Sequence, residues 1–165
     1  MTDQDRTLTH LDSQGKARMV DVSGKDESKR RAVAEGLIQM APATLAAIEA
    51  GDGPKGEVLQ VARIAGIQAG KRAGELIPLC HILPGASVSV DLSPDPSLPG
   101  IRVRSTASIQ GQTGVEIEAL TATTIALVTI YDMVKAMDRG MVMGDIRLVS
   151  KDGGASGSWT REKEL

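Results

Sequence analysis

Asp132 and Lys135 are the first candidates for chemistry in this sequence. They are the only charged residues between Ile125 and Met137, in a stretch whose pattern indicates a helix. Side chains three residues apart lie on one helix face, so the two should meet. A carboxylate beside an ammonium in an apolar setting can form an acid/base pair with mutually shifted pKa values. A structural ion pair at the edge of the core has the same spacing, and the pair alone does not decide between them.

His81 is the one polar aromatic residue in the apolar segment from Leu76 to Leu83. From this segment alone, a core histidine with a satisfied hydrogen bond is the favoured interpretation, and a place in an active site is the alternative. Cys80 precedes it. Neighbouring side chains in an extended segment point to opposite faces, so these two are not expected to form a nucleophile–base pair. Cys80 is expected to be a small buried residue.

Three cations recur at eight-residue steps in the segment from Pro54 to Ala73, namely Lys55, Arg63 and Lys71. In a helix, Lys55 and Lys71 would lie about 24 Å apart. One small ligand could touch both only if a second subunit completed its site, and otherwise their roles must differ. They could equally be unrelated surface cations.

Glu116 and Glu118 lie where the longest expected helix begins, and Thr113 with Glu116 matches a capping box. Two residues apart, these acids should not share a helix face, so at most one should face a site containing Asp132. Lys151 is followed by Gly153-Gly154. Such a stretch can bring backbone amides and a charge to a phosphate, although a flexible tail is the commoner outcome.

The composition indicates one soluble domain. The 165 residues fit a single core, which must be aliphatic because Phe is absent and Trp and Tyr occur once each. Few aromatic residues and a net charge of -2 argue against a nucleic-acid partner. A single cysteine, a polar N-terminus and the lack of a long apolar run predict a cytoplasmic protein without disulfides or a membrane span. Neither His10 nor His81 has metal-ligand spacing, so no metal or cofactor is expected.

The order of expected elements is strand, helix, hairpin, helix, strand. The first half of the chain is predicted to hold a strand near 33–40, a short helix from Pro42 to about Ala50 and a helix over 54–73. The second half is predicted to hold hairpin strands at 87–92 and 101–109, a helix over 114–138 and a strand over 142–150. Residues 1–18 and 153–165 are expected to be mobile. This order predicts an α+β, ferredoxin-like split βαβ fold, an antiparallel sheet with helices on one face.

Several motifs, in order and at fitting spacings, resemble the molybdenum cofactor biosynthesis protein C (MoaC) family of cyclic pyranopterin monophosphate synthases. The matching stretches lie at 19–23, 62–67, 76–81, 114–121, 130–136 and 147–154, within a resemblance that runs from about Leu8 to Trp159. Ile82 stands where the family usually has proline, and Ile117 stands where it usually has methionine.

The resemblance implies a lyase that converts (8S)-3',8-cyclo-7,8-dihydroguanosine 5'-triphosphate to cyclic pyranopterin monophosphate and pyrophosphate. It implies a homohexamer, a trimer of dimers, with active sites between subunits. Asp132 is then the catalytic acid/base residue, with Lys135 and Lys55 as its catalytic partners. The implied substrate-binding residues are Leu79, Cys80, His81, Ile117, Glu118, Lys71 and Lys151. The alternative is a non-catalytic, nucleotide-binding regulatory module of the same fold, because one fold hosts many functions.

Overall fold

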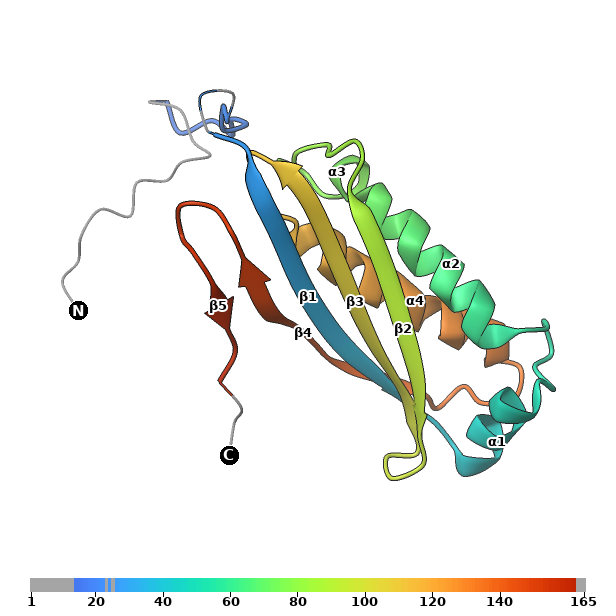
Figure 1. Ribbon diagram of the computed structural model, residues 1–165. Coiled ribbons are helices and arrows are strands. Elements are labelled where there is room, and N and C mark those ends of the chain that lie inside the picture. Colours follow the sequence, from blue (N-terminus) through green and yellow to red (C-terminus); the bar gives the residue numbers. More distant parts are fainter. Residues whose placement is uncertain (1–13, 23, 25, 163–165) are drawn as a thin grey trace.

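The computed structural model describes residues 14–22, 24 and 26–162, which form one sheet covered by helices (Figure 1). In chain order the elements are β1 (Ser28–Gln39), α1 (Pro42–Ala50), α2 (Val58–Lys71), α3 (Ala73–Leu76), β2 (Ser87–Asp95), β3 (Gly100–Gly111), α4 (Glu116–Val134), β4 (Val142–Asp152) and β5 (Trp159–Thr160). The sheet order is β2-β3-β1-β4-β5, and each neighbouring pair is antiparallel. The predicted α+β arrangement, an antiparallel sheet with helices on one face, is confirmed.

The core lies between the sheet and the two long helices. Alternate residues of β1, β2 and β3 point to that side, for example Ile38, Val90 and Val103, which are all buried. In Figure 1, α2 and α4 cross the same face of the sheet, and no helix of the described residues lies on the opposite face. A buried hydrogen bond of 2.9 Å joins the Thr123 and Ser105 hydroxyls and fastens α4 to β3.

Glycine allows α2 and α4 to cross closely. A Cβ at Gly66 would lie 2.8 Å from the Ala122 carbonyl oxygen, and one at Gly70 would lie 3.0 Å from the Glu118 carbonyl oxygen. The end of α2 therefore packs on the beginning of α4, so the two helices run antiparallel. This packing places residues at the end of α2 beside residues at the beginning of α4.

The α4 helix corrects two sequence predictions. Its N-cap is Val115, without a side-chain capping bond, so the Thr113/Glu116 capping box is wrong. Glu116 is itself the first helical residue, and its carboxylate lies over Gly114. The helix is also long and apolar enough to cross a membrane, which the sequence reading missed, but half of its apolar window is buried within the fold. A core helix has the same composition.

Other boundaries differ by a few residues. The first strand begins at Ser28 rather than near 33. The helix expected over 54–73 spans only Val58–Lys71, so Lys55 lies before it, and a separate short helix, α3, follows at Ala73–Leu76. Trp159–Thr160, in the tail expected to be mobile, pairs with β4. Residues 1–13 and 163–165 lie outside the described residues.

The helix crossing generates a stability prediction. Gly66→Ala should lower the free energy of unfolding by about 1–3 kcal/mol, because overpacking against the Ala122 backbone outweighs the higher helix propensity of alanine. Urea denaturation at a fixed protein concentration measures the change. Gln68→Ala, at an exposed position of the same helix, is the matched control and should stay within about 0.5 kcal/mol of the original protein. If Gly66→Ala also changed the free energy of unfolding by less than about 0.5 kcal/mol, the close crossing of the two helices would be contradicted.

Candidate functional site

Asp132, Lys55 and Lys135 form one cluster at the C-terminal end of α4. Lys55, in the turn before α2, donates to Asp132 Oδ2 at 2.6 Å, and Lys135, the C-cap of α4, donates to Oδ1 at 2.7 Å. The side chains are each about half exposed. The predicted meeting of Asp132 with Lys135 is therefore confirmed, and Lys55 joins them from a segment 77 residues away.

The two lysines keep Asp132 ionised. Hydrogen bonds from Lys135 first and Lys55 second lower the pKa of Asp132 to about 2. Each carboxylate oxygen has its own ammonium donor, so the group is a carboxylate at neutral pH. One negative and two positive charges leave a net cationic surface, which suits a phosphate. If a phosphate drew the lysines away, the basicity of Asp132 would rise.

A second cluster surrounds a hollow of about 520 Å³ at the N-terminal end of α4. Its lining residues are Val20, Val22, Leu79, Cys80, His81, Leu83, Thr113, Gly114, Glu116, Ile117 and Glu118. It contains five of the seven residues expected to bind substrate, namely Leu79, Cys80, His81, Ile117 and Glu118. Both acids at the start of α4, Glu116 and Glu118, line this hollow.

The loop from Leu79 to Ile82 is held tightly against α3. Leu79 has a left-handed φ of 61°. A Cβ at Gly74 would lie 2.7 Å from the His81 carbonyl oxygen, so only glycine admits the loop backbone there. His81 Nε2 lies 3.0 Å from the Val20 carbonyl oxygen. A carbonyl can only accept, so Nε2 carries the hydrogen and Nδ1 is the nitrogen left for a ligand. Ile82, at the usual proline position, is 67% exposed.

Glu118 and Cys80 both line the hollow, where Cys80 is partly exposed rather than buried as the sequence predicts. Glu118 is 3% exposed, and burial first, with the negative charge of Glu116 adding to it, raises its pKa. Burial and then the charge of Glu118 raise the pKa of the Cys80 thiol. Cys80 is therefore no activated nucleophile, as the sequence indicated. The hollow thus offers a carboxyl group that takes up a proton more readily than usual.

A polar recess of about 160 Å³ adjoins this hollow and shares Thr113, Gly114 and Glu116 with it. Lys151 lines the recess, where it contacts the Ser156 hydroxyl and lies 3.8 Å from Glu116 Oε1. Arg30 also lines it, and its guanidinium donates to the carbonyls of Gly111 and Gln112. The expected phosphate contact at Lys151 therefore lies beside the main hollow.

Sequence reasoning missed several residues of this region. They are Val20 and Val22, Thr113 and Gly114, Glu116, and Arg30. Glu116 was assigned to a cap, and Arg30 stands in a charge run that resembles a solvated surface. The short motif at 19–23 was the one sequence feature that could have indicated that Val20 and Val22 line the hollow.

One chain does not bring the two clusters together. Glu116 and Asp132 are sixteen residues apart in one helix, which is about 24 Å along its axis. His81, Glu118 and the exposed Lys71 lie toward the start of α4, whereas Lys55, Asp132 and Lys135 lie at its end. Within a single chain neither Glu116 nor Glu118 faces the Asp132 cluster, because the helix separates them. This is consistent with the prediction that at most one of them would. Among the described residues, no group of three or more His, Cys, Asp or Glu could hold a metal ion.

The lysine pair generates a titration prediction. Lys135→Ala should raise the pKa of Asp132 from about 2 toward its ordinary value of 3.8, because the largest lowering contribution is removed. Lys55→Ala should raise it less. Carboxyl-carbon NMR titration of Asp132 measures both shifts, with Asp138, whose pKa is lowered by the Ala41 and Gly140 backbone amides, as an internal reference. An unchanged Asp132 pKa in both variants would contradict the cluster.

Known proteins match this chain over most of its length. The chain is 56% identical to a cyclic pyranopterin monophosphate synthase of Dinoroseobacter shibae, over 94% of this chain and 98% of the relative. It is 55% identical to proteins of the same name from Brucella ovis and Brucella canis, over 92% of each chain. The model of the MoaC family matches residues 19–154, a range that holds both clusters, and the chain therefore belongs to the MoaC family.

Proposed function

We propose that this chain is a lyase of molybdenum cofactor biosynthesis. It converts (8S)-3',8-cyclo-7,8-dihydroguanosine 5'-triphosphate to cyclic pyranopterin monophosphate and pyrophosphate. The observation that carries the proposal is 56% identity, over nearly the full length, to a protein named cyclic pyranopterin monophosphate synthase. A non-catalytic regulatory module of the same fold is not favoured, because the curated relatives described above are named as synthases.

The site supports this chemistry through two oppositely tuned carboxyl groups. Opening a purine-derived ring and closing a pterin ring require proton transfers. Asp132 is ionised and acts as the catalytic base or, after taking up a proton, as the acid. Lys135 and Lys55 are its partners and stabilise the phosphate charge as pyrophosphate leaves. The raised pKa of Glu118 makes its carboxyl group a hydrogen-bond donor to the substrate more readily than an ordinary glutamate.

The remaining residues position the substrate. Leu79, Cys80 and Ile117 contribute shape and backbone groups to the hollow, and His81 offers Nδ1. Lys151 would hold a phosphate in the adjoining recess. Lys71 is exposed at the end of α2 nearest Glu118, so it would serve the same end of the substrate.

The site is complete only when two subunits meet. One chain separates Asp132 from Glu116 by about 24 Å of helix, more than one small substrate can bridge. The His81 hollow of one subunit should therefore face the Asp132 cluster of another. We expect a homohexamer built as a trimer of dimers, in the cytoplasm, with no nucleic-acid or membrane partner. The low aromatic content and the burial of α4 support the last two expectations.

The first activity prediction concerns the Asp132 carboxylate. Purified protein should convert the cyclic dihydro-GTP, and Asp132→Asn should lower kcat by about 10²–10⁴-fold, the range lost with a proton-transfer group. Product formation can be followed by liquid chromatography. Asp52→Asn, a matched change at an exposed aspartate, should keep full activity. Lack of turnover by the intact protein, or full turnover by Asp132→Asn, would refute the proposal.

A second prediction tests the shared site. Asp132→Asn and Glu118→Ala subunits should each be nearly inactive, and their random mixture should recover about a quarter of the original activity, because one site in four combines two intact halves. Asp132→Asn mixed with Lys55→Ala should recover nothing, since these residues belong to one cluster in one chain. Native mass spectrometry verifies mixing. Recovery in the second mixture, or none in the first, would contradict the arrangement.

A further inference from the structure

Asp138 lies where two junctions of the chain meet. It stands between the end of α4 and the start of β4, and Ala41 stands between the end of β1 and the start of α1. The two junctions are neighbours because Gln39, the last residue of β1, pairs with Val142, the first residue of β4. Asp138 and Ala41, which are 97 residues apart in the sequence, therefore come into direct contact.

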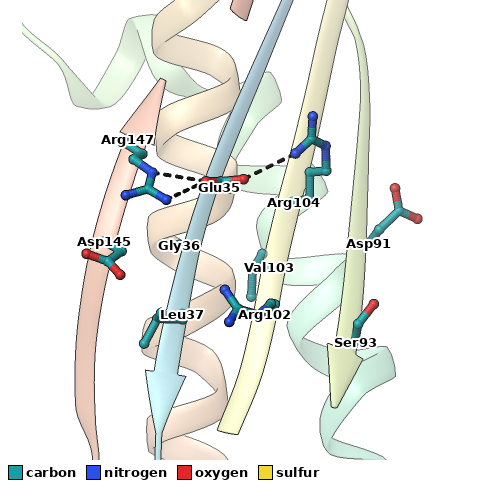
Figure 2. Close-up of a pocket in the computed structure, with 10 residues that line it drawn as sticks. All are labelled: Glu35, Gly36, Leu37, Asp91, Ser93, Arg102, Val103, Arg104, Asp145 and Arg147. Atoms are coloured by element: carbon teal, nitrogen blue, oxygen red, sulfur yellow. Dashed lines mark hydrogen bonds and ion pairs between the residues drawn. The ribbon is translucent and has the colours of Figure 1, made fainter. Parts of the chain in front are cut away.

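The sheet fixes the strand side of these junctions. Figure 2 shows Glu35 of β1 between Arg104 of β3 and Arg147 of β4, and the Glu35 carboxylate accepts from them at 3.1 and 2.9 Å. Together with the backbone ladders on either side of β1, these ion pairs hold the strands in place. The helix α1 and the turn after α4 leave the sheet, so they need a link of their own.

The Asp138 carboxylate supplies this link. Its Oδ2 accepts a hydrogen bond from the Ala41 backbone amide at 2.8 Å, and its Oδ1 accepts one from the Gly140 amide, also at 2.8 Å. Ala41 is the N-cap of α1, and α1 has no side-chain capping bond of its own. A capping box binds the N-cap amide with a side chain three residues further on, whereas here a side chain from a distant segment binds it.

The turn after α4 carries Lys135 as well as Asp138. The amides of Met137 and Asp138 both donate to the Val134 carbonyl, at 2.8 and 3.2 Å, so the chain stays compactly folded between the two residues. Lys135 is the C-cap of α4, and its ammonium donates to Asp132. Anchoring this turn through Asp138 therefore keeps the end of α4, and with it Lys135, in a fixed place.

The helix α1 leads to Lys55 through a compact turn. Gly51, the C-cap of α1, has a left-handed φ of 79°, and the Gly56 amide donates to the Gly53 carbonyl at 3.0 Å. A Cβ at Gly53 would lie 2.7 Å from the Gly56 carbonyl oxygen, so this turn has little room to rearrange. The position of α1 therefore determines where Lys55 begins its reach to Asp132.

We propose that Asp138 is a positioning residue of the candidate site. By joining the N-cap of α1 to the turn after α4, it fixes the two segments from which Lys55 and Lys135 reach Asp132. Both of its oxygens are occupied by backbone amides, so it acts through the lysines and not on a substrate. The inference rests on the proposed function only where it concerns activity, because the cluster is arranged without a substrate.

Asp138→Ala tests the proposal by two measurements. Without the link, both lysines should be held less firmly, so the pKa of Asp132 should rise from about 2 toward 3.8. Carboxyl-carbon NMR titration measures this shift and needs no substrate. In the activity assay, kcat should fall about 10–100-fold, because small displacements of catalytic groups have effects of this size. An unchanged Asp132 pKa, or an unchanged kcat in an enzyme that turns over, would overturn the proposal.

A second variant separates positioning from stability. Ala41→Ser would give α1 a capping side chain of its own, since the φ of -62° and ψ of 143° at Ala41 suit an N-cap. Added to Asp138→Ala, it should recover free energy of unfolding, measured by urea denaturation, while the pKa of Asp132 stays raised and kcat stays low. If Ala41→Ser also restored the pKa and kcat, Asp138 would only stabilise α1, and the positioning role would be refuted.

Two further variants complete the test. Glu49→Ala removes a carboxylate from an exposed position of α1 and should change neither the Asp132 pKa nor kcat. If Asp138→Ala does not fold, Asp138→Asn, which keeps one acceptor oxygen, provides the same comparison with a smaller shift in the same direction. A raised Asp132 pKa in variants of a protein without turnover would refute the lyase proposal and support the positioning role.

Discussion

The packing of α4 along the sheet is the constraint on which the site depends. Its 19 residues extend along most of the sheet. Close packing against Gly66 and Gly70 of α2 fixes the position of α4 relative to α2. Any residue attached to one end of α4 is therefore held far from residues at the other end. The fold orients each half of a site accurately but cannot unite the halves within one chain.

The two ends of α4 impose opposite behaviour on carboxyl groups. At the exposed C-terminal end, two ammonium groups lower the pKa of Asp132 to about 2. At the covered N-terminal end, burial raises the pKa of Glu118. Groups whose surroundings push their pKa values apart are the usual basis of acid and base roles in one site. In the proposed shared site, a reaction with several proton transfers would gain both kinds of group from the ends of α4 in different subunits.

Local sequence pattern predicted the fold and one ion pair of the candidate site. Alternation over 87–92 and 101–109 and the spacing of Asp132 and Lys135 are short-range properties, and the structure confirms both hairpin strands and the ion pair. The placement of Lys55 on Asp132 depends on how the turn before α2 meets the end of α4, which no local pattern contains. The role of Glu116 could not be predicted either, because a glutamate at this position fits both a capping box and the lining of a pocket. The contribution of Val20 to the hollow depends on His81, 61 residues later.

The proposed shared site limits how two subunits can meet. Each subunit carries an Asp132 cluster at one end of α4 and a hollow at the other end. A two-fold axis that sets two α4 helices antiparallel would complete two sites at one interface, because each end meets the opposite end of its partner. A head-to-tail contact would complete only one site at each interface, and the outer ends would stay unused unless the subunits closed into a ring.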